Sequence, residues 1–162
     1  MPTAFSFSAL HDEIYNGPLK DDLAPFLAPV NDHAVADILN TKHPDWTCRN
    51  PEVPLFVLSE WGAANGRREK IEACAASGPP GLKSLGLTAQ DMIRVPLLPN
   101  ATFNIDRPSV GVMMGTLVTY GVLTQDDLTA FMALGDVLGA SRAEVLWGHG
   151  VVVTPEQVAS AR

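Results

Sequence analysis

The chain has little charge and no concentration of positive charge. Only 18% of its 162 residues are charged, and the formal net charge is −7. Lys and Arg are scattered singly apart from one short group at Arg67, Arg68 and Lys70, so no basic stripe is present to neutralise phosphates. We therefore do not expect the protein to bind nucleic acid.

Long apolar runs are also missing. No segment approaches the ~20 consecutive apolar residues that span a bilayer, and residues 1–9 lack the charged start and apolar stretch of a signal peptide. We expect no membrane insertion, and we expect the protein to be made in the cytoplasm.

Cysteine is scarce. Cys48 and Cys74 lie in different segments and belong to no CxxC pair. A zinc site or a disulfide framework therefore has no support from spacing, and both residues are expected to be free, half-buried thiols.

Hydrophobic residues, by contrast, make up 46% of the chain. A domain of about 150 residues buries roughly two-thirds of its unfolded surface, so this content is enough for one core. The sequence contains no repeat or long linker, which predicts a single domain over residues 1–162. Because so little charge is available to coat the surface, we expect a partner to cover part of it.

The predicted fold class is mainly α, a compact helical domain with one or two short β-strand pairings. Polar residues that accept hydrogen bonds at helix starts are frequent, and Gly, Asn-Gly or Pro follow most of the apolar periodic segments. Helices are predicted to follow Ser6 or Ser8, Asn31, Pro54, Gly66, Thr124, Ser141 and Thr154.

Two further segments are expected to be interrupted helices. Pro25 should limit residues 19–27 to a turn and a half. In residues 82–95, Gly86 and Thr88 predict a break with a new helix start at Thr88. Short extended segments are expected at residues 47–49, within 96–105, and at the valine run 151–153.

Residues 110–122 form the most apolar stretch and carry Gly111, Gly115 and the pair Met113-Met114. Small residues four apart let two helices approach closely. This helix is therefore expected in the core or in a subunit contact.

The histidines show no metal-ligand spacing such as H-x-x-x-H or H-x-E. His11 and His33 are interpreted as solvated surface residues. His149 differs because Gly148 and Gly150 free the backbone to present its side chain, although a plain turn residue is the favoured interpretation. The sequence predicts no metal and no cofactor.

No serine or cysteine stands in a nucleophile motif such as G-x-S-x-G, and no catalytic residue is predicted. Cys48 with His43 or His149 is the remaining formal pairing. The acid pairs Asp21-Asp22 and Asp126-Asp127 fall where helix starts favour negative charge, so capping explains them.

Aromatic residues supply most of the interface candidates. Trp61 and Trp147 are expected in the core, whereas Trp46 lies in an irregular segment and is expected at an interface or ligand contact as readily as in the core. The predicted interface residues are Trp46, His43, Met113, Met114 and His149.

Two stretches carry a family resemblance. One runs from Ile38-Leu39-Asn40-Thr41-Lys42 through Val53-Pro54 and Trp61 to Ala64-Asn65-Gly66-Arg67. The other is Ser141-Arg142-Ala143-Glu144-Val145-Leu146-Trp147-Gly148, followed by residues 150–154 and Val158. Together they resemble a family of small, largely uncharacterised proteins encoded in the structural gene modules of tailed bacteriophages, often near tail and tail-fibre genes.

The resemblance implies a non-enzymatic virion protein, found in the host cytoplasm during assembly and then in the virion. Its partners would be other virion proteins, in a homo-oligomer or symmetric array. A tail position at the baseplate or fibre attachment is the first expectation. A head decoration protein and an assembly or host-directed protein are the alternatives. Residues 78–106 depart from the family pattern and are a candidate for a partner contact of this member.

Overall fold

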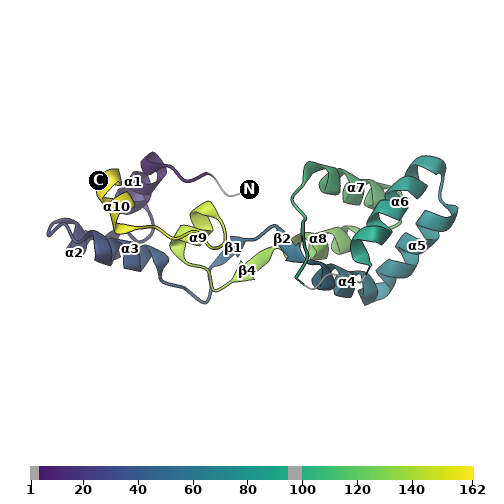
Figure 1. Cartoon of the computed structure of the whole chain (residues 1–162), viewed down its shortest axis with the longest axis horizontal. Coiled ribbons are helices and arrows are strands. Elements are labelled where there is room, and N and C mark those ends of the chain that lie inside the picture. Colours follow the sequence, from purple (N-terminus) through teal and green to yellow (C-terminus); the bar gives the residue numbers. More distant parts are fainter. Residues whose placement is uncertain (1–3, 95–99) are drawn as a thin grey trace. The chain divides into compact units, whose positions relative to one another are not determined.

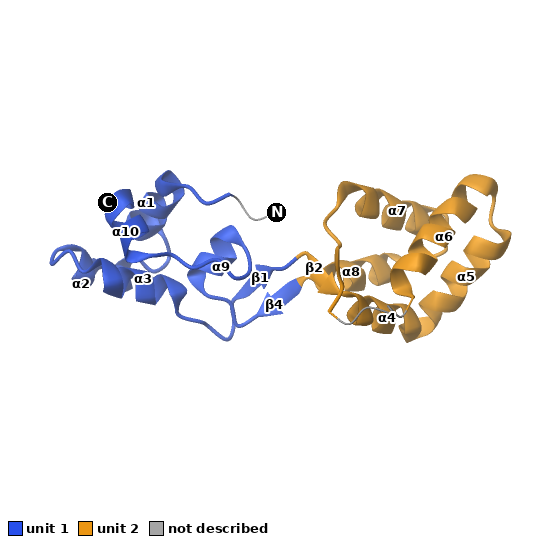
Figure 2. Ribbon diagram, in the orientation of Figure 1, with its two compact units in different colours: residues 1–50, 136–162 blue, residues 51–135 orange. Residues whose placement is uncertain are grey.

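A computed structural model describes residues 4–94 and 100–162. Their contacts gather the chain into two compact units, residues 1–50 with 136–162 (unit 1) and residues 51–135 (unit 2) (Figure 2). Each unit has its own hydrophobic core. The single domain expected from the sequence stays a prediction, because a unit defined by contacts need not fold alone.

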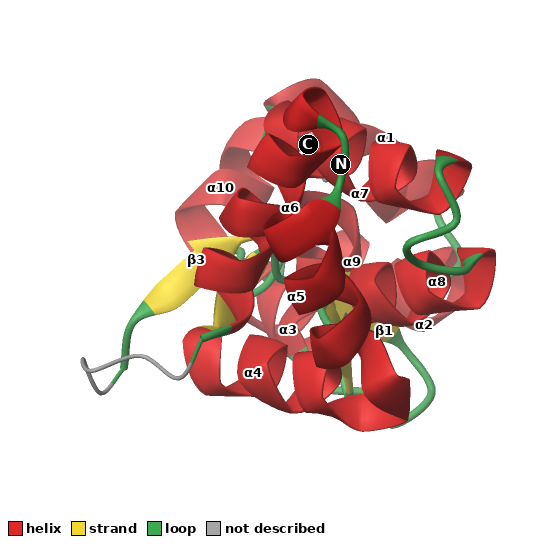
Figure 3. Cartoon of the chain, turned by 90° about the vertical axis from the view of Figure 1, so that its right-hand side faces the viewer, coloured by secondary structure: helices red, strands yellow, loops and turns green. Residues whose placement is uncertain are grey.

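The predicted fold class is confirmed. Helices dominate both units (Figure 3), and the strands of the described residues form two small antiparallel pairs, β1 with β4 and β2 with β3. Among the described residues, no helix is long and apolar enough to cross a membrane.

Unit 1 is built from α1, α2, α3 and α10 together with the β1–β4 pair and α9 (Figure 1). Side chains of Ser6, Asn31, Ser141 and Thr154 cap its helices as predicted. The elements are α1 Phe7–Asn16, α2 Lys20–Leu27, α3 Asp32–Asn40, β1 Thr47–Arg49, β4 Asp136–Leu138, α9 Arg142–Trp147 and α10 Pro155–Ala161.

The core of unit 1 joins the two ends of the chain. Leu10, Leu39 and Val158 are fully buried within one cluster. Near this core the Glu13 carboxylate, buried itself, accepts two hydrogen bonds from the Arg142 guanidinium at 2.7 and 2.8 Å. This bidentate pair fixes α1 against α9.

Unit 2 is a helical body closed by the β2–β3 pair. Asn65 and Gly66 both adopt positive φ angles (57° and 69°), which confirms the left-handed helix end predicted there. The elements are β2 Glu52–Pro54, α4 Leu55–Ala63, the 3-10 turn η1 Ala64–Gly66, α5 Arg67–Ser77, α6 Pro80–Ile93, β3 Thr102–Asn104, α7 Pro108–Thr119 and α8 Gln125–Ala133.

A buried ion pair lies inside unit 2. Arg67 donates from Nε to Asp127 Oδ1 at 2.7 Å and from Nη1 to the Trp61 carbonyl at 3.0 Å. Asp127 also completes a capping box with Thr124 at the start of α8. Both members of the pair therefore have hydrogen-bond partners, as buried charges require.

The predicted interruption at Pro25 is wrong, because α2 runs continuously through it. A proline removes its own N–H from the helix ladder and crowds the carbonyl four residues earlier, but α2 spans Lys20–Leu27 with Pro25 inside it. Leu23 is fully buried, so packing holds this short helix together.

The predicted break at Gly86 and Thr88 is also wrong. The Thr88 hydroxyl donates to the Ser84 carbonyl at 3.1 Å within α6 instead of capping a new helix. A Cβ on Gly86 would lie 2.7 Å from the backbone nitrogen of Ala75. This glycine allows α5 and α6 to approach closely rather than ending a helix.

The predictions of extended segments are confirmed in part. Strands form at residues 47–49 and 102–104, whereas 151–153 forms none and β4, which was not predicted, pairs with β1. Valine propensity alone was insufficient, because Val153 bonds to the Asn40 side chain and meets no strand. Residues 96–99 of the predicted extended segment lie outside the described residues.

Candidate functional site

The candidate site of unit 1 stands on a long-range pairing of two chain segments. Cys48 of β1 lies opposite Val137 of β4, and Lys42 forms an isolated antiparallel bridge with Ser141. Between them, the His43 N–H donates to the Ala140 carbonyl at 3.0 Å. The pairing brings residues 42–48 alongside the start of α9.

A glycine-flanked turn presents His149. Gly148 and Gly150 have φ angles of 102° and 80°, a region that side chains disfavour, so this turn depends on glycine at both positions. The His149 N–H donates to the Arg49 carbonyl at 3.4 Å. The turn is thereby tied to β1.

Glu144 is held by a dense set of donors. Its Oε2 accepts from the Ser141 N–H at 2.8 Å and pairs with the Lys42 ammonium, and its Oε1 accepts from the Gly150 N–H at 3.0 Å. Burial alone would raise the pKa of this carboxyl, but the hydrogen bonds from Lys42 and the two N–H groups lower the pKa to about 2. Glu144 is therefore an anion in neutral solution.

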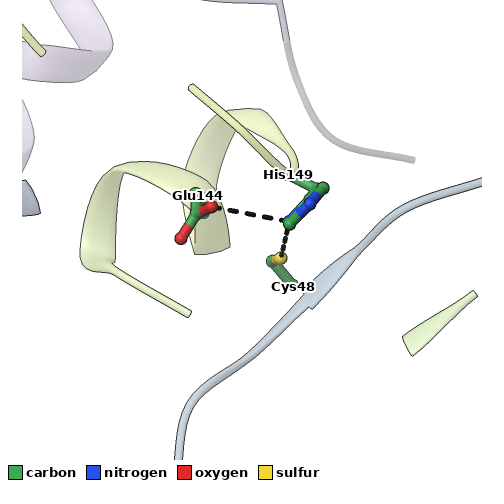
Figure 4. A group of neighbouring side chains, drawn as sticks. All are labelled: Cys48, Glu144 and His149. Atoms are coloured by element: carbon green, nitrogen blue, oxygen red, sulfur yellow. Dashed lines mark hydrogen bonds and ion pairs between the residues drawn. The ribbon is translucent and has the colours of Figure 1, made fainter. Parts of the chain in front are cut away.

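Three side chains meet at one nitrogen atom (Figure 4). The Cys48 Sγ lies 3.7 Å from His149 Nδ1, and Glu144 Oε1 lies 3.5 Å from the same nitrogen. All three ligand atoms lie within 4.8 Å of one another. Cys48 and Glu144 are buried, whereas 42% of the His149 side chain is exposed. The cluster is therefore buried at Cys48 and Glu144 and open to solvent at His149.

The same geometry argues against an activated cysteine. Burial, followed by the negative charge of Glu144, raises the pKa of the Cys48 thiol. In a nucleophilic triad the carboxylate orients the base through the ring nitrogen that faces away from the nucleophile. Here the carboxylate and the thiol both lie at Nδ1, so Glu144 does not orient the ring through its second nitrogen as a triad requires.

A groove lies beside this cluster in unit 1. The His43 and Trp46 rings stack with their centroids 4.9 Å apart, and Trp46 is half-buried. The groove has a volume of about 400 Å³, and Lys42, the partner of Glu144, also lines it. Its remaining lining residues are Leu19, Asp22, Ile38 and Thr41.

Burial decides the outcome for the other residues that the sequence analysis singled out. Met113 is 5% exposed and Met114 is fully buried, so both belong to the core of unit 2. The prediction that they are interface residues is wrong, because the exposed face of α7 is the opposite one, which carries the glycines. Trp61 and Trp147 are buried as predicted. Cys74 is free but buried rather than half-buried, as is Cys48.

Sequence reasoning missed Glu144 and Lys42 as members of the site. Glu144 had been assigned only as the last residue of the S-x-x-E capping box, which the structure confirms. Cys48 and His149 are 101 residues apart, so no local spacing could unite them with Glu144. The usable signals were the glycines around His149 and the formal pairing of Cys48 with His149, whose side chains the structure brings together.

Comparison with known proteins found no matching family model, no matching curated protein and no matching solved structure. The resemblance to the phage family therefore stays an expectation.

Proposed function

We propose that the protein is a non-enzymatic structural component of a tailed-phage virion that acts through protein–protein contacts. A tail position, at the baseplate or fibre attachment, is the leading form of the proposal. The groove of unit 1 supports action through protein–protein contacts, and the resemblance in residues 35–67 and 122–162 supports the virion setting.

The groove has the chemistry of a contact site. Large aromatic residues are enriched among the few residues that dominate binding energy, and Trp46 offers one ring face to His43 while remaining half-buried. Leu19 and Ile38 add apolar surface, and Asp22 supplies a charge at the rim. The occupant that fits is a segment of another virion protein with an apolar side chain for the groove floor.

Copy number in purified particles tests the proposal. Quantitative mass spectrometry should find this chain at a fixed ratio to the major capsid and tail-tube proteins, with a few to a few dozen copies per particle. Hundreds of copies would support the head decoration alternative. Absence from particles would contradict both and favour an assembly or host-directed protein.

The groove itself is tested by Trp46→Ala. This variant should lose most of its incorporation into particles, whereas Tyr120→Ala, which removes a 68% exposed aromatic ring from unit 2, should be incorporated normally. Circular dichroism of both variants controls for folding. Normal incorporation of a folded Trp46→Ala protein would contradict a contact through the groove.

The enzymatic alternative depends on Cys48 and His149. If Cys48→Ser and His149→Ala both leave phage production unchanged, that alternative loses its support in this cluster. A collapse of phage production with normal particle incorporation would instead favour chemistry at the cluster over a structural role.

Self-association belongs to the same proposal, since virion components commonly occupy symmetric positions. Light scattering across a range of concentrations tests it. A strictly monomeric mass at every concentration would count against a homo-oligomer in isolation.

A further inference from the structure

The strongest unassigned feature of the described residues is the meeting of Cys48, Glu144 and His149 in unit 1. Both neighbours of His149 Nδ1 approach it from the protein interior, at 3.7 Å for the sulfur and 3.5 Å for the carboxylate oxygen. A neutral imidazole carries at most one proton on Nδ1 and cannot direct it fully at two acceptors. A metal ion would be a single partner common to the sulfur, the oxygen and the nitrogen, whose atoms lie within 4.8 Å of one another.

The separations suit a tetrahedral zinc ion. With Zn–S of about 2.3 Å and Zn–N or Zn–O of about 2.0 Å, the edges of a tetrahedron are about 3.3–3.6 Å long. The observed distances of 3.7 and 3.5 Å need only a slight contraction to reach these edges. The third edge, from Cys48 Sγ to Glu144 Oε1, lies within 4.8 Å and would close toward about 3.6 Å on binding.

Glu144 has one lone pair left for such an ion. A carboxylate offers about four acceptor positions. Oε2 uses two, for the Ser141 N–H and the Lys42 ammonium, and Oε1 uses one for the Gly150 N–H. The remaining position on Oε1 is on the oxygen that faces His149 Nδ1. Hydrogen bonds of this kind hold a ligand in place before the metal arrives.

We propose that Cys48 Sγ, Glu144 Oε1 and His149 Nδ1 bind one Zn²⁺ ion. Thiolate and imidazole favour zinc over Mg²⁺ and Ca²⁺, which take oxygen ligands. The exposed histidine leaves the fourth position to water or to a ligand from outside the chain. On binding, the Cys48 S–H bond breaks, its proton goes to solvent, and the sulfur lone pair forms the Zn–S bond.

The ion would join β1, α9 and the 148–150 turn, all within unit 1. Because an ion that binds only the folded chain stabilises it, zinc should raise the melting temperature. Hydrogen exchange should slow around residues 46–50 and 141–151 and stay unchanged in unit 2. This inference does not depend on the virion proposal, since zinc binding is measured on the isolated protein.

Isothermal titration of the full chain, treated beforehand with chelator, tests the site. The wild type should bind one equivalent of Zn²⁺, and bound Co²⁺ should show a thiolate-to-metal charge-transfer band. Cys48→Ser should lose that band, and His149→Ala should weaken zinc binding by more than the ~10–100-fold typical of losing an outer-shell contact. His149 is exposed, so its variant is expected to fold.

Matched controls are present in the same chain. Cys74→Ser removes the other buried thiol, and His33→Ala removes another exposed histidine of unit 1; both should bind zinc as the wild type does. The proposal is overturned if the wild type binds no zinc, if Cys48→Ser keeps the cobalt charge-transfer band, or if His33→Ala weakens binding as much as His149→Ala.

Discussion

The two units use the same local motif to bury a carboxylate and then surround it differently. Asp127 in unit 2 and Glu144 in unit 1 each occupy the third position of a helix capping box. Asp127 then meets the buried guanidinium of Arg67, whereas Glu144 pairs with the exposed Lys42 ammonium and also lies beside a thiol and an exposed imidazole. The cap sets where a carboxylate is placed, and its further neighbours decide whether it serves a closed ion pair alone or can also act as a ligand.

The largest expected effect comes from breaking the closed pair of unit 2. Asp127→Asn would leave the Arg67 charge buried without a counter-charge. Removing one partner of a buried pair costs about 3–5 kcal/mol of the free energy of unfolding. Urea denaturation of the wild type and the variant measures this loss.

An exposed ion pair of unit 1 is the matched control. Arg49 Nη1 lies 2.9 Å from Asp136 Oδ1, but about half of the Asp136 side chain is exposed. Asp136→Asn should therefore cost less than about 1 kcal/mol. Equal losses in the two variants would show that burial is not what distinguishes the pairs.

Acid should weaken unit 2 through the same carboxylate. Burial alone would raise the pKa of Asp127, but hydrogen bonds from Thr124 and Arg67 lower it from 3.8 to about 2. Because the pKa of Asp127 is lower in the folded state than in the unfolded state, its ionised carboxylate stabilises the fold above about pH 4. This stabilisation is lost as the pH falls from about 4 through about 2. The loss should be about 2 kcal/mol.

Other carboxyl groups titrate in the same range, so the measurement is a difference between proteins. Unfolding free energies at pH 5 and pH 2 are compared for the wild type and Asp127→Asn. The variant should show the smaller decrease. An identical decrease in both proteins would rule out a contribution from Asp127.

A smaller effect tests how tightly unit 2 is packed. A Cβ on Gly86 would lie 2.7 Å from the Ala75 backbone nitrogen and 3.0 Å from the Cys74 sulfur. Gly86→Ala should force α5 and α6 apart and cost about 1–2 kcal/mol despite the better helix propensity of alanine. Thermal unfolding measures it, and a stabilised variant would show that the helices are free to separate.

Local signals predicted the helix starts well, because capping depends on residues three apart. Ser141 with Glu144, and Thr154 with Gln157, form the boxes that the sequence indicates. Local signals failed where packing decided the outcome. Gly86 resembles a helix break until α5 is placed against it, since its small size serves that contact.

The candidate site was predictable only in part, for the same reason. The glycines flanking His149 indicated that this side chain is presented by the backbone, and the structure confirms their positive φ angles. Its partner Cys48 reaches it through the pairing of β1 with β4, a strand that the sequence did not indicate. Propensity says nothing about which distant segments pair, so the third member, Glu144, could be assigned only as a cap.

The smallest effect returns to the turn of unit 1. Gly150 has a φ angle of 80°, but a Cβ added there would have no atom within 4 Å, so alanine would meet backbone strain without a clash. Gly150→Ala should cost about 1 kcal/mol, and Gly150→Asn less, because asparagine tolerates left-handed backbone better. Gly111, equally open but helical, is the control, and Gly111→Ala should stabilise by about 0.5–1 kcal/mol. If both alanine variants are more stable than the wild type, the turn relaxes freely and does not hold His149 for a ligand. If Gly150→Ala is destabilised while Gly111→Ala is stabilised, the strained turn of unit 1 holds the His149 side chain in place at a cost in stability.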